Sequence, residues 1–332
     1  LGLISLPAML RAGYDPNLAT GVICASGTLG QIIPPSTVLI FMGDMLSGIN
    51  SQVQMAKGNF APMPVSVGDL FAGALLPGIL LVGLYLSYVL FKAATAPASC
   101  PATPVPADEK GELLRDFFVA LVPPLLLIFA VLGSILGGIA TPTEAASVGA
   151  VGAMVLATLR WRLSFRILRE TVVATATITS MVFVILLGAS VFSIVFRMMG
   201  GDNLVHEFLS NLPGGPLAAV AVVMIIMFFL GFILDTFEII FIVIPITAPV
   251  LLMLDINPIW LGVLVGVNLQ TSFLTPPFGF ALFYLRGVAP AELPTSAIYK
   301  GILPFVLLQV VAIAILFAFP QIVTWLPKVI SG

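Results

Sequence analysis

Two apolar stretches of this chain carry prolines at matching positions, and the members of each pair are 242 residues apart. The matched pairs are Pro7 with Pro249, Pro16 with Pro258, Pro34 with Pro276, and Pro35 with Pro277. A Pro-Pro pair removes backbone donors and clashes with the preceding turn, so each stretch is expected to contain a broken helix. A repeat in which both halves break an apolar helix predicts the binding site of a secondary transporter.

The composition identifies the lipid bilayer as the solvent of the chain. Hydrophobic residues make up 60% of the 332 positions, charged residues make up 8%, and the mean hydropathy is +1.17. A water-soluble domain of this length would have to expose a continuous apolar surface. We therefore expect an all-α integral membrane protein, with helices of about 20 residues that cross roughly 30 Å of hydrocarbon. Nothing in the charge pattern indicates a nucleic acid partner.

The distribution of basic residues predicts the orientation of the helices. Four arginines lie close to Trp161, which indicates a cytoplasmic membrane edge because Lys and Arg favour that side. Alternation outward from this edge places the C-terminus in the periplasm. It also favours a re-entrant hairpin over a single crossing for residues 217–254, because the hairpin leaves more basic residues in the cytoplasm. The two proline-matched stretches then run in opposite directions, which makes an inverted repeat.

The two helix breaks are the places where chemistry is expected. Freed carbonyls and nearby hydroxyls are hard oxygen ligands for an alkali cation, and half-helix N-termini favour an anionic group. The predicted cation ligands are Gly27, Thr28, Gln31, Asn268, Thr271, Ser272 and Thr275. The alternative is that the Pro-Pro pairs only kink two packed helices.

Two charged residues in apolar surroundings are candidates for the same site. Asp235 lies at the middle of an apolar run, where an acidic side chain costs about 2.5–3.5 kcal/mol on insertion scales. It lines the site or completes an ion site, or else it caps the second arm of the hairpin with Thr236 and Glu238. Arg197 ends a span on the non-cytoplasmic side, where it attracts a substrate carboxylate, pairs with Asp235 or reaches the headgroups.

The segment from Thr141 to Glu144 has a structural interpretation. Thr at the N-cap, Pro142 at the first helical position and Glu at the third form a capping box. We therefore predict that Glu144 stabilises a helix start and takes no part in the site.

Four motifs, taken together, resemble the large membrane subunit, DctM type, of the tripartite ATP-independent periplasmic (TRAP) transporters. They are Pro7 to Tyr14, Gly27 to Ser36, Gly138 to Ala145 and Leu274 to Gly279. The resemblance covers the whole chain. The loop from Asn50 to Val67 resembles the subgroup labelled for mannitol or chloroaromatic compounds.

This resemblance implies a multi-pass protein of the bacterial inner membrane that is not an enzyme. It implies uptake of a small organic acid, coupled to sodium ions, by an elevator mechanism. The expected partners are a periplasmic substrate-binding protein and a small membrane subunit of four helices. No cofactor is expected, and sodium as the coupling ion is the expected metal.

The resemblance also assigns roles to segments of the chain. The expected segments are the arm of the first hairpin, the first broken helix and a periplasmic loop (1–67), a scaffold helix (68–92), a cytoplasmic linker (93–112), scaffold and connecting helices (113–199), the second hairpin and second broken helix (200–286), and a C-terminal helix (287–332). Pro7 to Arg11 would be the tail of the first hairpin, and Phe232 to Pro245 would form the second hairpin. Because the chain begins with Leu1 inside an apolar run, we interpret it as lacking the upstream tip of the first hairpin.

Substrate-binding residues follow from the same mapping. Ser36, Asp235 and Arg197 fall where the family carries functionally important polar residues. The predicted substrate-binding set is Ser36, Thr37, Arg197, Asp235, Thr236 and Thr275.

Two other classes of protein share some of these features. A citrate or dicarboxylate carrier that works without a binding protein would also have inverted hairpins and broken helices, and a passive channel would have a continuous pore. An intramembrane protease would need one of the known pairs of catalytic motifs, and none of these is present.

Overall fold

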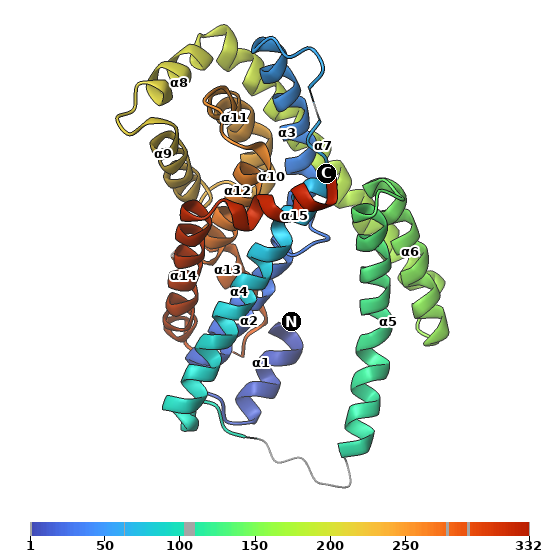
Figure 1. Cartoon of the computed structure of the whole chain (residues 1–332). Coiled ribbons are helices and arrows are strands. Elements are labelled where there is room, and N and C mark those ends of the chain that lie inside the picture. Colours follow the sequence, from blue (N-terminus) through green and yellow to red (C-terminus); the bar gives the residue numbers. More distant parts are fainter. Residues whose placement is uncertain (1, 63, 103–109, 277–278, 291–292, 332) are drawn as a thin grey trace. The chain divides into compact units, whose positions relative to one another are not determined.

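The computed structural model describes residues 2–62, 64–102, 110–276, 279–290 and 293–331. The regular secondary structure of these residues is entirely helical (Figure 1), which confirms the all-α prediction. The chain forms two compact units. The larger unit contains Leu1–Pro101 and Gly188–Gly332, and the smaller one contains Ala102–Leu187.

The larger unit begins with the first proline-containing stretch. Its helices are α1 (Gly2–Arg11), α2 (Pro16–Thr28), the 3₁₀ turn η1 (Leu29–Gln31), α3 (Thr37–Ala56), α4 (Val67–Thr95) and the 3₁₀ turn η2 (Pro97–Ser99). After the end of α7 (Phe165–Met198) the unit continues with α8 (Gly201–Ser210), α9 (Gly215–Leu230), α10 (Thr236–Glu238), the π-helix η3 (Ile239–Val243), α11 (Ile244–Met253), α12 (Pro258–Leu274), α13 (Phe280–Val288), α14 (Thr295–Ala318) and α15 (Gln321–Ser331).

The smaller unit contains α5 (Lys110–Leu136), α6 (Pro142–Leu159) and most of α7. Helix α5 packs against α6, and the Arg160 guanidinium after α6 donates to the Val119 carbonyl of α5. At the start of α6, Glu144 accepts a hydrogen bond from the Thr141 N–H at 2.8 Å, and its own N–H donates to the Thr141 hydroxyl at 3.3 Å. The predicted capping box is therefore confirmed.

Six helical segments within the described residues are long and apolar enough to cross a bilayer. They are Val67–Thr95, Arg115–Leu136, Pro142–Leu159, Phe165–Met198, Thr236–Met253 and Thr295–Ala318. Large apolar side chains are exposed along several of them, for example Phe91, Phe129 and Val184. Exposed side chains of this kind suit contact with lipid tails, so the structure has the surface of an integral membrane protein.

The repeat of matched prolines is visible in the local geometry. Helices α2 and α12 both begin with Pro at the first helical position, preceded by a side chain that caps the helix. The Asp15 carboxylate accepts hydrogen bonds from two free N–H groups of α2, at 2.8 and 3.0 Å. The Asn257 side-chain oxygen accepts the equivalent bonds of α12, at 2.9 and 3.0 Å. The two stretches therefore start with the same N-terminal structure.

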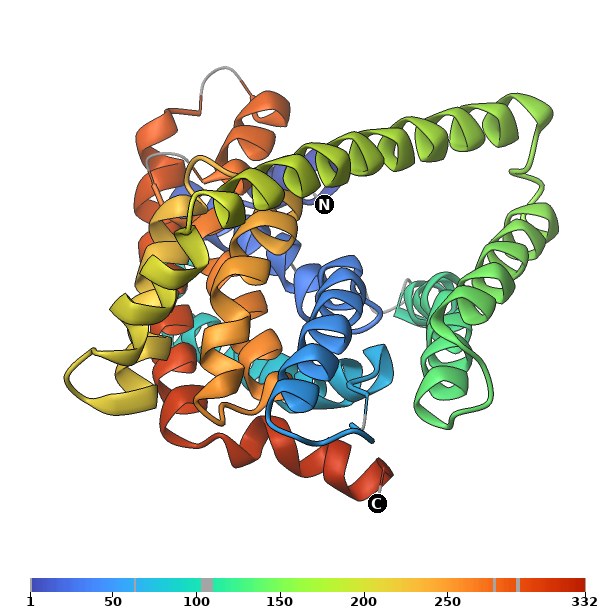
Figure 2. The same ribbon diagram turned by 90° about the horizontal axis from the view of Figure 1, so that it is seen from above.

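The packing of the two stretches is also reciprocal. Helix α3 of the first stretch contacts α11 of the second, and α13 of the second contacts α1 of the first. Helix α2 packs on α14, and α12 packs on α4. In both views the first stretch (blue) and the second (orange) lie side by side (Figures 1 and 2). Reciprocal contacts of this kind are expected when two halves are related by an approximate two-fold axis.

The contact between α2 and α14 depends on two glycines. A Cβ atom on Gly21 would overlap the carbonyl oxygen of Gly301, and one on Gly301 would overlap the carbonyl oxygen of Asn17. The Thr20 hydroxyl donates to the Asn17 carbonyl at 3.0 Å and lies 3.4 Å from that of Ala297 on α14. The two backbones are thus in direct contact, as small residues allow in membrane helix pairs.

Helix α9 and the segment α10–η3–α11 form a two-helix hairpin. Residues 231–235 join them, and both η3 and α11 contact α9. The segment also packs on α3, where the Phe41 ring meets the Phe237 and Phe241 rings edge to face at 5.4 and 5.6 Å. A hairpin therefore occupies the region in which the sequence predicts one. Its re-entrant position in the bilayer stays a prediction.

Helix α4 lies in the same compact unit as both proline-containing stretches. It packs against α3, α12, α14 and the final helix α15. Helices α5 and α6 belong to the other unit. The expectation that α4 serves as a scaffold helix together with α5 stays a prediction.

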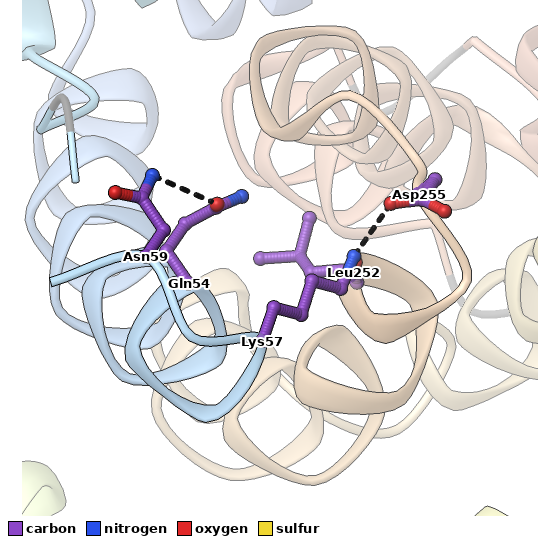
Figure 3. Close-up of polar contacts among 5 residues, drawn as sticks. All are labelled: Gln54, Lys57, Asn59, Leu252 and Asp255. Carbon is purple, nitrogen blue, oxygen red and sulfur yellow. Dashed lines mark hydrogen bonds and ion pairs between the residues drawn. The ribbon is translucent and has the colours of Figure 1, made fainter.

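An ion pair ties the end of α3 to the end of α11 (Figure 3). The Lys57 ammonium donates to the Leu252 carbonyl at 2.7 Å and to the Asp255 carboxylate at 2.6 Å. The Lys57 side chain is 24% exposed, whereas that of Asp255 is 89% exposed. The carbonyl bond is therefore the better shielded of the two. It adds a charged donor to a carbonyl near the C-terminal end of α11, which also accepts a hydrogen bond from the Asp255 N–H at 3.2 Å.

We predict that Gly21→Ala lowers the stability of the protein by about 1–3 kcal/mol, because the added methyl group has no room at the α2–α14 contact. The measurement is thermal unfolding of the purified full-length protein in detergent. Gly83→Ala in α4 is the matched control, because nothing lies within 4 Å of its Cβ position, and it should be neutral or slightly stabilising. Equal effects of the two substitutions would contradict the close contact.

We predict that Lys57→Met lowers stability by about 1–2 kcal/mol, because it removes a partly buried hydrogen bond from a charged donor to the Leu252 carbonyl. Asp255→Asn should cost less than about 1 kcal/mol, because an exposed ion pair contributes little. Both values come from denaturant or thermal unfolding. Arg166→Gln, which removes an exposed ion pair with Glu170 in α7, is the control. A larger loss for Asp255→Asn than for Lys57→Met would refute this ranking.

Candidate functional site

The first helix break combines exposed backbone with a buried polar side-chain atom. Helix α2 ends at Thr28, the turn η1 follows, and the Pro34–Pro35 peptide bond is cis. Gly27 is exposed, with nothing within 4 Å of its Cβ position. The Gln31 side-chain oxygen is buried and has no hydrogen-bond partner among the described residues. The break therefore presents both accessible backbone and an unpaired polar atom.

Ser36 and Thr37 start the helix that follows this break. Ser36 is 1% exposed and caps α3, since its hydroxyl accepts a hydrogen bond from the Leu39 N–H at 3.3 Å. The same hydroxyl donates to the Gln31 carbonyl, which fixes the geometry of the break. Thr37 is the first residue of α3 and is exposed. An accessible helix N-terminus of this kind carries partial positive charge and favours an anion.

The second break follows α12. Thr275 lies just beyond the last residue of the helix, and its hydroxyl donates to the Thr271 carbonyl at 2.7 Å. Thr271 and Ser272 are both fully buried, and their hydroxyls donate to carbonyls one turn earlier in α12. Pro277, the second member of the matched Pro-Pro pair, lies outside the described residues.

The helices that lead into the two breaks contact each other. Gln270 of α12 donates from its side-chain nitrogen to the Thr28 hydroxyl of α2 at 3.3 Å. These residues are separated by 242 positions, the same interval as the proline pairs. Next to them, a Cβ on Gly266 would lie 3.1 Å from the Ile32 side chain, so the helices approach closely. Matching positions of the two halves are therefore in contact.

Two other predicted ligands face the hairpin. Asn268 is 4% exposed and donates from its side-chain nitrogen to the Met224 carbonyl of α9 at 2.8 Å. Ser272 lies four residues later on the same helix face, and a Cβ on Gly231, just after α9, would overlap its hydroxyl. The polar face of α12 is therefore packed against the first arm of the hairpin.

Asp235 lies at the start of the second arm of the hairpin, as the N-cap of α10. Its N–H donates to the Glu238 carboxylate at 3.1 Å, so the arrangement suits the capping alternative. The next residue, Thr236, is 5% exposed, and its hydroxyl has no hydrogen-bond partner among the described residues. Asp235 therefore takes part in a helix cap, whereas the hydroxyl of Thr236 is left without a hydrogen-bond partner among the described residues.

Arg197 lies near the end of α7, in the part that belongs to the larger unit. Its guanidinium is 3.4 Å from the Asp202 carboxylate, and its side chain is 56% exposed. In this structure Arg197 therefore pairs with Asp202 and not with Asp235. The exposed pair with Asp202 leaves the guanidinium accessible from outside the protein.

Sequence reasoning passed over one acidic residue with the same signal as Asp235. Asp44 lies in the middle of α3, whose residues are mostly apolar, and it is exposed. Its carboxylate forms no hydrogen bond and no ion pair with the described residues. It precedes Arg286 of α13 by 242 residues, so an acidic residue in the first half and a basic residue in the second occupy matching positions. An ionisable residue within a membrane helix is a candidate functional residue by default.

The donor set around the breaks consists of neutral oxygens. It includes hydroxyls, amide oxygens and main-chain carbonyls, and the described residues contain no group of three or more His, Cys, Asp or Glu that could hold a metal ion. Hard neutral oxygens suit an alkali cation better than a transition metal. The arrangement can therefore bind a small cation and, at the N-terminus of α3, an anionic group.

Comparison with known proteins places the chain in a family. Residues 1–322 match the family model described as "Tripartite ATP-independent periplasmic transporter, DctM component". This family consists of transporter permeases and not of enzymes.

Three relatives illustrate the similarity. The chain is 31% identical to the C4-dicarboxylate TRAP transporter large permease protein DctM of Pseudomonas aeruginosa, over 99% of the chain and 70% of the relative. It is 30% identical to the DctM protein of Vibrio cholerae, over 100% of the chain and 73% of the relative. It is 26% identical to the sialic acid TRAP transporter permease protein SiaT of Haemophilus influenzae, over 99% of the chain, and spans 50% of that protein. These matches agree with the repeat and with the helical membrane fold. The chain therefore belongs to the DctM family of TRAP transporter large permeases.

Proposed function

We propose that this chain forms the solute-translocating part of a TRAP transporter that takes up a small organic acid with sodium ions. The observation that carries the proposal is the contact between the helices that lead into the two breaks, where Thr28 and Gln270 of opposite halves touch. A broken helix in hydrocarbon leaves backbone groups unpaired, and these are tolerated where they line a cavity or pack on protein. Two such breaks at one place form a natural site for an ion and a solute.

Sodium is proposed as the coupling ion because of the chemistry of the ligands. The candidate ligands are Gly27, Thr28, Gln31, Asn268, Thr271, Ser272 and Thr275. They offer carbonyl, hydroxyl and amide oxygens, which sodium prefers. The unpaired oxygen of Gln31 and the exposed backbone at Gly27 are the features that most directly call for a ligand. Bound cations would also offset the negative charge of an organic acid within the membrane.

The substrate is proposed to be a carboxylate. Two of the relatives are named for C4-dicarboxylates and one for sialic acid, all of which are carboxylic acids. In this chain the N-terminus of α3, at Ser36 and Thr37, is suited to hold such a group. Thr236, Thr275, Asp235 and Arg197 complete the proposed substrate set. To bind the substrate, the Arg197 guanidinium would have to release the Asp202 carboxylate.

The proposed partners follow from the family. The word "tripartite" in the family description supports two further components, a periplasmic substrate-binding protein and a small four-helix membrane subunit. The whole transporter would lie in the bacterial inner membrane, with the C-terminus of this chain in the periplasm. In the proposed elevator mechanism, the unit that contains both breaks moves relative to a scaffold.

The test is uptake into proteoliposomes by the full-length protein with its small subunit. Uptake of a labelled organic acid should require an inward sodium gradient and added binding protein, because the binding protein delivers the solute. Choline replaces sodium in the control. Uptake that is unchanged without the gradient would reject sodium coupling, and uptake without the binding protein would instead favour a carrier of the citrate or dicarboxylate type.

Two substitutions at Asp235 separate a role in the site from a role in the helix cap. Asn caps helices as well as Asp does but carries no charge, whereas Ala removes the cap. If the carboxylate serves the site, we expect both Asp235→Asn and Asp235→Ala to lower uptake at least tenfold, with unfolding of the Asn variant unchanged. Wild-type uptake by the Asn variant, with loss in the Ala variant, would assign Asp235 to capping alone.

A further inference from the structure

A third Pro-Pro pair lies outside the two proline-matched stretches. Pro123 and Pro124 belong to the smaller unit and lie inside α5, which stays helical on both sides of them. At the first pair of the chain, Pro34 and Pro35, the helix is broken instead. The same dipeptide therefore has two outcomes in one chain, and the difference must lie in what surrounds it.

Two carbonyls of α5 lose their regular partners at the third pair. In an α-helix each carbonyl accepts from the N–H four residues later, so the partners of Val119 and Ala120 would be Pro123 and Pro124. Proline has no N–H, and neither bond can form. Both carbonyls lie within the apolar span Arg115–Leu136, where lipid tails offer no donor. Another part of the protein therefore has to supply one.

Arg160 donates to both of these carbonyls. One terminal nitrogen of its guanidinium, Nη2, donates to the carbonyl of Val119 and, at 3.3 Å, to that of Ala120. This nitrogen carries two N–H groups, which is the number that the two prolines remove. Its positive charge also suits carbonyls at an interruption, because they carry partial negative charge like those at the end of a helix. The two new bonds thus replace the two lost ones, residue for residue.

The end of α6 brings Arg160 to this position. Arg160 directly follows the last residue of the helix, and Trp161 then adopts a left-handed conformation with φ of 55°. The Arg162 N–H donates to the Ala157 carbonyl at 2.9 Å. The Trp161 N–H donates to the Thr158 carbonyl at 2.9 Å, which completes a Schellman motif. Residues other than glycine seldom adopt this conformation, so α6 ends beside the interruption in α5 even though this ending strains the backbone.

Helix α6 contacts α5 on both sides of the proline pair. Before the pair, the contact is the guanidinium of Arg160. After the pair, a Cβ on Gly152 of α6 would overlap the Leu127 side chain. One turn earlier in α6, a Cβ on Gly149 would lie 3.2 Å from the Val131 side chain. Helix α6 therefore spans the interruption and holds both parts of α5.

We propose that Arg160 is a latch that keeps α5 continuous across its proline pair, and that α5 bends at this pair when the guanidinium is withdrawn. At Pro34–Pro35 the donor to the Gln31 carbonyl is the Ser36 hydroxyl, which lies on the same stretch of chain. At the third pair the donor comes from a neighbouring helix that also grips α5 further along, and this accounts for the continuous helix. The latch depends on the fold of the smaller unit and not on the proposed sodium coupling.

Hydrogen exchange in the purified full-length protein tests the latch through a double-mutant comparison. Arg160→Met should raise the amide exchange of residues 117–127 about tenfold, because it removes two bonds from a charged donor. With Pro123→Ala and Pro124→Ala both present, the two N–H donors are restored, and Arg160→Met should then change the exchange less than about twofold. An equal increase in both backgrounds would overturn the proposal, since Arg160 would then act on something other than the two carbonyls.

Arg162→Met is the matched control. It removes the same charge two residues further along the chain, from a residue that is also exposed. Its backbone N–H is kept, so the end of α6 is preserved. The control should leave the exchange of α5 as it is in the wild type. If the two substitutions raised that exchange equally, Arg160 would serve only as a positive charge at the membrane edge, and the latch would be rejected.

The bend is measured separately, as the distance between spin labels on either side of the proline pair. The labels are attached at Glu112→Cys and Phe129→Cys, two exposed positions, after replacement of Cys24 and Cys100 by alanine. With Arg160 in place the distance distribution should be narrow. Arg160→Met should broaden it toward shorter distances, and the two Pro→Ala substitutions should make it narrow again. A distribution that stays the same in Arg160→Met would refute the bend.

Discussion

The structure depends on the need to pair backbone polar groups where no water is available. Each half of the repeat interrupts an apolar helix with prolines, which leaves carbonyls without donors. Within the first interruption the Ser36 hydroxyl donates to the Gln31 carbonyl, and just before it the side chains of Thr28 and Gln270 form a hydrogen bond across the two halves. The caps at Asp15 and Asn257 do the same at the other ends of these helices. Hydrogen bonds at these places therefore lower the free-energy cost of interrupting a helix within the membrane.

The sequence predicts those features that follow from spacing along the chain. The proline interval of 242 residues predicts two matching broken helices, and the structure shows matching caps at Asp15 and Asn257. The capping box at Thr141 is readable because its members are three residues apart. The family could be identified from short motifs because these contain several residues of fixed spacing.

The features that the sequence does not predict arise from contacts between distant residues. Arg160 and Val119 are separated by 41 positions, and no local pattern shows that they face one another. Lys57 carries no local signal for its partners, yet it pairs with Asp255 and a helix carbonyl. Asp44 is different, because an acid within an apolar helix is a signal that the sequence does show.

The glycine contact between α2 and α14 has a consequence for motion. Because the backbones of Gly21 and Gly301 touch, a shift of either helix relative to the other changes the contact between them. One helix comes from the first half of the repeat and the other from the second. A displacement that keeps this contact carries α2 and α14 together, and any hinge that permits such a displacement lies elsewhere in the chain.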